Sequence, residues 1–323
     1  MKPESPLDSP VKTVCRKHVD AYLLHLAAER RLSPNTVASY RRDLESLLST
    51  LEKHDTEASK ATVLDIREVV IKIRKKGLAA ASVARHLSSW RGFYAYAGLR
   101  LGYPLNPCAG FKGPKVRRAL PKTLSPEACT HLLDSRATPK IIDNDALLAR
   151  DRAMFELLYS SGLRISELTG LNLIDVDLKA GEARVTGKGD KTRIVPVGKI
   201  AGRAIKAWLA WRDTFLKGKE EKALFLSKRG TRICPRSVQL RLDSWAQGST
   251  LGQAVHPHML RHAFASHMLQ SSGDLRAVQE MLGHASISTT QIYTHLDWQH
   301  LAKVYDQAHP RAKRVKDGNG TEP

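Results

Sequence analysis

The segment from Lys112 to Lys122 constrains the fold most, because it breaks the chain into two halves. It reads KGPKVRRALPK, with five basic residues, two prolines and no acidic residue. Proline fixes the backbone dihedral and removes a hydrogen-bond donor, so the segment favours an extended linker between domains. A basic linker is either simply solvated or follows the phosphates of a duplex. At 323 residues, the chain is long enough for two domains with separate cores.

Helical patterns follow one another up to about residue 100 and predict a bundle of four helices. The second pattern has Ser33 as a cap and Pro34 in its first turn, and the third stops at Gly77. Apolar stripes at three- and four-residue spacing predict the core of this domain. Basic residues on the opposite faces are either solvated or in contact with DNA, and the candidates are Arg41, Arg42, Lys72 and Arg85.

The second half predicts helices around a small β-sheet, so the expected fold class is mostly α with a small sheet, with an α+β second domain. A helix capped at Ser125 precedes a long helix that ends at Gly162. A later helix opens at Pro257 and stops before Gly273. The strand candidates are Val176 to Leu178, Ala183 to Val185 and Arg193 to Val197, the last two joined by a turn over Gly187, Lys188, Gly189 and Asp190.

The charge of the chain points to a polyanionic partner. Lys and Arg total 52 against 32 Asp and Glu, which gives a formal net charge of +20 and a pI near 10.0. Nucleic acid is the first candidate. The four cysteines form no CxxC pair, and the chain shows neither an apolar leader nor a stretch long enough to span a membrane. We therefore expect a cytoplasmic protein without membrane insertion, thiolate metal site or disulfide framework.

Tyr293 is the candidate nucleophile, because it lies nine residues after His284 in a chain that also offers guanidinium, ammonium and imidazole groups. A tyrosine phenol has a pKa of about 10, so its attack on a phosphodiester needs a proton acceptor. The charge of the attacked phosphate must be neutralised as well. Two arginines that donate paired hydrogen bonds, together with other cationic donors, can do this without a magnesium ion.

The remaining candidates each have an ordinary alternative. Arg164 stands at a helix start, where an arginine is often a surface residue, and Lys188 lies at a turn that suits either an exposed lysine or a phosphate loop. His258 and Arg261 are one helical turn apart and suit a phosphate clamp. His258 and His262 also have a spacing seen in metal sites. However, the chain has no HExxH motif and Arg261 would oppose a cation, so we expect no metal and no cofactor.

Five segments of the second half together resemble the active-site motifs of tyrosine recombinases of the bacterial Xer type. The segments are GLRISEL, GKGDKTR, HPHMLRHAFASHML, MLGHASISTTQIYTH and AHPRA. Any one of them is unspecific, but five in the right order are highly specific, and the similarity extends from about Val14 to Arg314. Two departures are mild, because Ala263 and Ser266 stand where relatives often have serine and threonine.

The resemblance implies a role for each candidate. Tyr293 would form a 3′-phosphotyrosyl bond and release a 5′-hydroxyl, with His258 as the acceptor of its proton. Arg164 and Arg261 would hold the scissile phosphate. The last two roles are carried by His284, which would donate a hydrogen bond to the phosphate, and Lys188, which would protonate the leaving 5′-oxygen. No ATP is implied, because the phosphotyrosyl bond keeps the energy of the broken diester.

The resemblance also implies a domain plan and partners. We expect disordered ends at 1–10 and 313–323, a helical core-binding (SAM-like) domain at 11–105 and a basic linker at 106–122. The catalytic domain should span 123–312, and the two domains should close around DNA as a clamp. The implied partners are a double-stranded DNA recombination site and a second recombinase, XerD, in a heterotetramer that exchanges strands through a Holliday junction. The implied role is chromosome dimer resolution under control of the FtsK translocase.

Other interpretations fit the same residues. The same chemistry serves phage or transposon integrases and topoisomerase-like enzymes, and a non-catalytic DNA-binding factor could keep the fold alone. The end of the chain is a further choice. Leu296, Leu301, Val304 and Tyr305 predict an amphipathic helix that ends before Pro310. Its apolar face either packs on its own domain or, as a docking helix, occupies a groove on a neighbouring protomer, and we expect the latter.

The first prediction concerns the nucleophile. Tyr293→Phe removes one oxygen atom, so we expect the variant to bind DNA nearly as well as the parent protein but to form no covalent adduct. The measurement is denaturing gel analysis of a nicked suicide substrate. Phosphotyrosyl product from the purified variant would place the nucleophile elsewhere.

Overall fold

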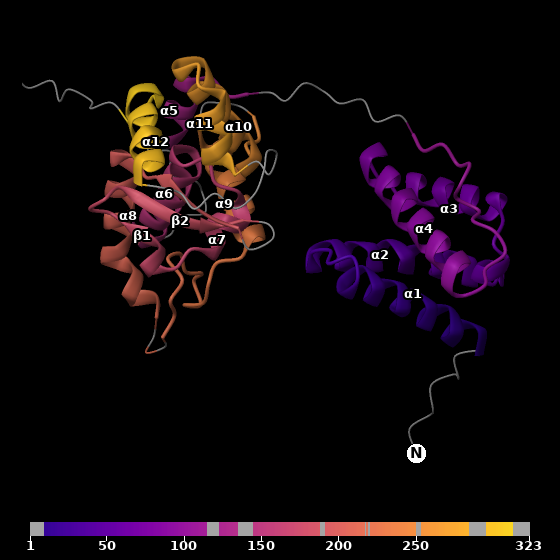
Figure 1. Ribbon diagram of the computed structural model, residues 1–323. Helices are drawn as coiled ribbons and strands as arrows, with labels where there is room; N and C mark the ends of the chain where they lie inside the picture. The colour runs from indigo at the N-terminus through magenta and orange to yellow at the C-terminus, as the bar shows by residue number, and fades with distance from the viewer. Residues whose placement is uncertain are drawn as a thin grey trace, which may run out of the picture. The chain divides into compact units, whose positions relative to one another are not determined.

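The chain divides into two compact units, Met1–Ala119 and Leu120–Pro323 (Figure 1). Each unit has its own hydrophobic core. The fold is mostly helical with one small sheet, as the sequence predicts. Within the described residues, no helix combines the length and the apolar character needed to cross a bilayer. The computed structural model describes residues 10–114, 123–134, 145–187, 191–216, 218, 220–249, 253–283 and 295–312. The expected disordered ends, apart from residue 10, lie outside these ranges.

The first unit is the expected set of four helices. The side chain of Ser33 caps the second helix by accepting a hydrogen bond from the backbone of Thr36, and Gly77 follows the third helix with a positive φ of 82°. The buried indole of Trp90 donates to the carbonyl of Asp43 over 2.8 Å and joins the second and fourth helices. The elements are α1 (Pro10–Ala28), α2 (Pro34–Leu51), η1 (Glu52–His54), η2 (Ala58–Lys60), α3 (Val63–Lys75) and α4 (Ala80–Arg100).

The four candidate DNA-contact residues of this unit all have partners within the protein. Arg41 pairs with Asp20 at 2.6 Å, and Arg85 pairs with the buried carboxylate of Asp43. Lys72 donates to Thr50, and Arg42 donates to Ser39. Contact with DNA would therefore use their remaining donors or exchange these partners.

The first unit extends past residue 105, where the sequence placed the start of the linker. Cys108 is fully buried in its core. The guanidinium of Arg91 donates to the carbonyls of Cys108 at 3.2 Å and Phe111 at 3.1 Å, which ties this stretch to α4. The packing of this unit thus continues past residue 105 towards the basic segment, of which residues 115–122 lie outside the described chain.

In the second unit, helices precede and follow a three-stranded sheet. Ser125 caps α5 as expected, because its hydroxyl accepts from the backbone of Ala128 at 3.1 Å. The helices are α5 (Pro126–Asp134), α6 (Asp145–Ser160), α7 (Ile165–Gly170), α8 (Lys199–Arg212), α9 (Pro235–Gly248), α10 (Pro257–Ser272), α11 (Leu275–Leu282) and α12 (His295–Ala308), with short helices η3 (Leu173–Asp175) and η4 (Asp213–Phe215).

The sheet confirms the strand prediction and positions a turn. It consists of β1 (Val176–Asp177), β2 (Glu182–Thr186) and β3 (Thr192–Pro196), all antiparallel in that order. Strands β2 and β3 form a hairpin in which Val185 faces Arg193. Gly187 closes the hairpin by donating to the carbonyl of Lys191 over 2.8 Å. Lys188 at the tip lies outside the described residues.

The core of the second unit is built around α6, which packs closely against α8 and contacts α10 and α9. Two buried indoles find partners within this core. Trp208 donates to the carbonyl of Leu224 at 2.9 Å, and Trp245 donates to the carbonyl of Leu132 at 2.8 Å. Each indole buries apolar area, and its hydrogen bond also joins its helix to another segment of the chain.

The C-terminal helix α12 packs on its own domain, beside α10 and α11 (Figure 1). Leu301 and Tyr305 are buried, and the Tyr305 hydroxyl lies 2.8 Å from the hydroxyl of Ser160 on α6. The ring of His309 stacks on that of Tyr305 with centroids 4.8 Å apart. The single chain thus adopts the alternative in which this helix covers its own core. Docking on a neighbour, which we expected, would require these contacts to break.

Arg311 connects the segment that follows α12 to the rest of the second unit. Its guanidinium donates to Glu156 at 2.6 Å and to Asp134 at 2.8 and 3.2 Å. Burial lowers the pKa of Arg311, but the hydrogen bonds and charges of Asp134 and Glu156 outweigh it and leave the pKa above its usual range. Burial also raises the pKa of Glu156, against the influence of Arg311.

Arg311→Met should therefore destabilise the second unit. Loss of one partner leaves the buried carboxylate of Glu156 without its cation, at a cost of about 3 kcal/mol. We expect the defect to shrink as the pH falls, because protonation removes the charge of a carboxyl whose pKa is already raised. The measurement is urea unfolding followed by tryptophan fluorescence at several pH values.

Two variants control this stability prediction. Arg152→Met breaks a half-exposed pair with the same Asp134 and should cost less than about 1 kcal/mol. Glu156→Gln combined with Arg311→Met removes both buried charges and should recover much of the loss. Equal stability of Arg311→Met and the parent protein would show that the pair is not part of the anchor.

Candidate active site

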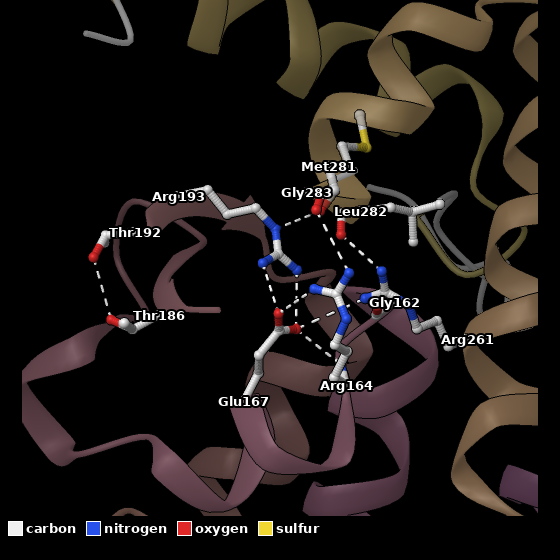
Figure 2. A network of polar contacts seen from close by, with 10 residues as sticks. All are labelled: Gly162, Arg164, Glu167, Thr186, Thr192, Arg193, Arg261, Met281, Leu282 and Gly283. Atoms are coloured by element: carbon white, nitrogen blue, oxygen red, sulfur yellow. Dashed lines mark hydrogen bonds and ion pairs between the residues drawn. The ribbon is translucent and has the colours of Figure 1, made fainter. Parts of the chain in front are cut away.

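The junction of α6 and α7 positions Arg164. Gly162 adopts a positive φ of 57°, and a Cβ there would lie 2.3 Å from the ring of Phe264, so only glycine fits this turn. Arg164 follows as the N-cap of α7, and its backbone N–H donates to the carboxylate of Glu167 at 2.8 Å. This turn directs the Arg164 side chain toward Glu167 and the end of α11 (Figure 2).

Arg261 reaches the same place from α10. Its guanidinium donates to the carbonyl of Gly162 at 2.6 Å and to the carbonyl of Leu282 at 2.7 Å. Burial, together with the charge of Arg164, lowers the pKa of Arg261 to about 10, which still leaves the guanidinium protonated at neutral pH. Two residues separated by 97 positions in the sequence are thus brought side by side, as the motifs imply.

The carboxylate of Glu167 organises the cluster. Arg164 and Arg193 donate to it at 2.7 and 2.8 Å, and Arg261 lies 3.7 Å away (Figure 2). Burial would raise the pKa of Glu167, but the hydrogen bonds and charge of Arg193, followed by the backbone and side-chain hydrogen bonds of Arg164, lower it below its usual range. An ionised carboxylate therefore sits among three guanidinium groups, and the cluster keeps an excess of positive charge.

The exposure of the three arginines separates their roles. The side chain of Arg164 is 34% exposed and that of Arg261 is 11% exposed, whereas that of Arg193 is 5% exposed. Arg164 and Arg261 can therefore offer donors to a phosphate from solvent. Bidentate guanidinium donors suit the oxygens of a phosphodiester and its transition state.

His258 stands one turn before Arg261 on α10, and its side chain is exposed. Desolvation of its ring lowers its pKa, and the nearby His256, Arg261 and Arg164 lower it further. A lowered pKa keeps the imidazole neutral at pH 7, which is the form that accepts a proton. His267, further along α10, is buried, and its ring bridges the Tyr159 hydroxyl and the carbonyl of Leu124 at 2.9 Å each.

The other predicted site residues, Lys188, His284 and Tyr293, lie outside the described residues. Their neighbours are described: Gly187 closes the hairpin before Lys188, and Gly283 caps α11 directly before His284. Helix α12 begins at His295, two positions after Tyr293.

The sequence-based reasoning missed Glu167 and Arg193. Glu167 stands three residues after Arg164 at a helix start, a spacing typical of a capping carboxylate, and this signal could have identified it. Arg193 lay inside a predicted strand, where the alternation with Val195 marks an inward-facing position. A charged residue at such a position indicates a buried partner, which the sequence alone did not identify.

Comparison with known proteins defines the class. The profile described as phage integrase family matches residues 124–300, and that described as phage integrase, N-terminal SAM-like domain, matches residues 19–100. The chain belongs to the phage integrase family, the tyrosine recombinases that act as DNA strand-exchange enzymes.

The similar curated proteins are of the Xer type that the motifs resemble. The chain is 50% identical over 299 residues to tyrosine recombinase XerC of Pseudomonas syringae pv. syringae (strain B728a), a match that covers 92% of this chain and 97% of the relative. It is 48% identical over 299 residues to tyrosine recombinase XerC of Escherichia coli O139:H28 (strain E24377A / ETEC), covering 92% and 98%.

Solved structures share the fold at low sequence identity. The XerH site-specific recombinase bound to difH substrate, in a pre-cleavage complex, has a TM-score of 0.68 at 21% identity and covers 94% of this chain and 100% of that chain. A lambda integrase (75-356) dimer bound to a COC' core site has a TM-score of 0.62 at 18% identity, covering 86% and 99%.

Removal of either Arg164 or Arg261 should slow the chemical step. We expect Arg164→Ala or Arg261→Ala to reduce single-turnover cleavage about 10²- to 10³-fold, which corresponds to roughly 3–4 kcal/mol, because each removes a preorganised donor to the phosphate. Arg276→Ala, at an exposed position on α11, is the matched control and should cleave normally. Full cleavage by either cluster variant would contradict the phosphate-binding assignment.

Proposed function

We propose that this protein is a site-specific tyrosine recombinase that cuts and rejoins DNA through a 3′-phosphotyrosyl intermediate and a Holliday junction. The observation that carries the proposal is the pair of accessible guanidinium groups, Arg164 and Arg261, held 2.7 and 3.7 Å from one buried carboxylate. This arrangement fits a phosphodiester and needs no metal ion. Family membership supports the same chemistry.

In the proposed cleavage step, the phenolic oxygen of Tyr293 attacks the phosphorus and the bond to the 5′-oxygen breaks. His258 accepts the phenolic proton, and its lowered pKa favours the neutral form needed for that role. Arg164 and Arg261 neutralise the charge that develops on the phosphate oxygens, and His284 donates a further hydrogen bond. Lys188 transfers a proton to the leaving 5′-oxygen. The reverse reaction with another 5′-hydroxyl reseals the strand.

The proposed partners follow from the relatives. The similar XerH structure is bound to its difH substrate, and a double-stranded recombination site is the proposed substrate here. The match to XerC proteins supports chromosome dimer resolution together with a XerD partner in a heterotetramer, with FtsK as the controlling translocase. A chromosomal substrate implies that the protein acts in the cytoplasm.

A phage or transposon integrase with the same chemistry is the alternative, and one experiment tests both proposals. Covalent protein–DNA complexes are captured from cells and the attached DNA is sequenced, with Tyr293→Phe as the control. We expect a single chromosomal site that depends on the tyrosine. Attachment sites of a mobile element would support the integrase role, and the absence of any tyrosine-dependent adduct would contradict recombinase function.

Cleavage of a purified suicide substrate carrying the captured site provides the biochemical test. We expect a covalent adduct that forms in excess EDTA, since the proposed cations are all side chains. A mobility shift without an adduct would indicate a non-catalytic DNA-binding factor. Strict metal dependence would contradict the mechanism.

Lys188 has its own test. If it is the general acid, Lys188→Ala should lose roughly 10²- to 10⁴-fold in cleavage of normal DNA. A bridging 5′-phosphorothiolate should restore much of the rate, because a thiolate leaves without protonation. Equal defects on the two substrates would show that Lys188 stabilises the phosphate or positions the DNA instead.

A further inference from the structure

Arg193 is a buried arginine that the proposed mechanism does not use. It lies on the inward face of β3, two residues before buried Val195. Its Nε donates to the carbonyl of Met281 at 2.7 Å, and its two terminal nitrogens donate to the two oxygens of Glu167 at 2.8 and 3.0 Å (Figure 2). All three nitrogens thus face protein acceptors, and with the side chain 5% exposed the group is not placed to bind a phosphate from solvent.

The end of α11 is held by the whole arginine cluster. The carbonyls of Met281 and Leu282 accept from Arg193 and Arg261 at 2.7 Å each, and the carbonyl of Gly283 lies 3.5 Å from Arg164. The last carbonyls of a helix have no partner within it and carry partial negative charge, so guanidinium groups suit them.

Arg193 is also packed tightly against this helix end. Gly283 has a positive φ of 64°, and a Cβ at this position would lie 3.1 to 3.2 Å from atoms of the Arg193 side chain. The backbone immediately before His284 is therefore fitted to Arg193 as well as hydrogen-bonded through Met281.

The balance of charge shows what Arg193 contributes. Among the described residues, Arg193 is the partner whose side chain offers Glu167 two parallel hydrogen bonds, while Arg164 offers one from its side chain and Arg261 lies at 3.7 Å. Without Arg193, the cations left beside the carboxylate in the described part of the chain would be Arg164 and Arg261. Those two guanidinium groups would be drawn to Glu167, and more of their positive charge would be compensated by its carboxylate and not by a phosphate.

We propose that Arg193 is a positioning residue for DNA cleavage: it neutralises Glu167 and holds the end of α11, which leaves Arg164 and Arg261 free to bind the scissile phosphate. The inference rests on the proposed function and adds a residue to it. Arg193 also lies on the strand that follows Lys188, but its contacts run to Glu167 and α11. Its effect is therefore on the phosphate-binding side of the site.

The test is single-turnover cleavage of the suicide substrate by Arg193→Met, with all DNA bound. We expect a loss of about 10²-fold, comparable to removal of a preorganised donor, with half-site affinity changed by less than about threefold. A bridging 5′-phosphorothiolate should not restore the rate, because the defect does not lie in protonation of the leaving group. If that substrate restored the cleavage rate, Arg193 would act by supporting Lys188 in leaving-group protonation, and the inference would be overturned.

A second variant separates positioning from loss of folding. Glu167→Gln combined with Arg193→Met removes the unbalanced carboxylate, so we expect it to cleave at least tenfold faster than Arg193→Met alone. Arg203→Met, an exposed arginine on α8, is the matched control and should cleave normally. Thermal unfolding identifies the variants that remain folded.

The outcomes distinguish the two proposals. If the parent protein forms no tyrosine-dependent adduct, the proposed function fails. If the parent cleaves and Arg193→Met cleaves equally fast, the inference about Arg193 fails alone. A slow Arg193→Met variant that the Glu167→Gln change does not rescue, in a double variant that remains folded and binds DNA, would assign Arg193 a structural role and also overturn the inference.

Discussion

The buried carboxylate of Glu167 is the interaction on which the site depends. It is 1% exposed and contacts arginines from the N-cap of α7, from β3 and from α10. A carboxylate in this position would be costly without partners, and each guanidinium would repel the others without it. One acidic group therefore allows three cations to converge while leaving the cluster positive. The negative charge of a substrate phosphate can neutralise the positive charge that remains on the cluster.

The fold serves this arrangement by bringing distant segments to one point. Gly162 allows the turn that carries Arg164 past Phe264, and its carbonyl then accepts from Arg261. The hairpin presents Arg193 from the sheet, while α11 contributes carbonyls rather than side chains. Backbone carbonyls and charged side chains thus form one hydrogen-bonded cluster, so a shift of any one element would disturb the others.

Local chemistry explains what the sequence could predict. Ser33, Ser125 and Gly273 mark helix ends because a cap depends on residues a few positions away. The strands and the placement of Arg164 beside Arg261 were also predicted, the latter through the family motifs. Other contacts between residues far apart in the sequence were not predicted. The pairing of Glu167 with Arg193 and the burial of Cys108 depend on packing, which neither periodicity nor spacing encodes.

The cis packing of α12 has a kinetic consequence. Tyr305 and His309 are buried in a stack of rings, and Arg311 fastens the chain just beyond them. A partner that needs this helix must wait for it to detach, and local opening of this kind carries its own free-energy cost. The observed rate of association would then level off as partner concentration rises, at the rate at which the helix opens. Under those conditions, release of the helix, and not the encounter between subunits, would limit the rate of assembly.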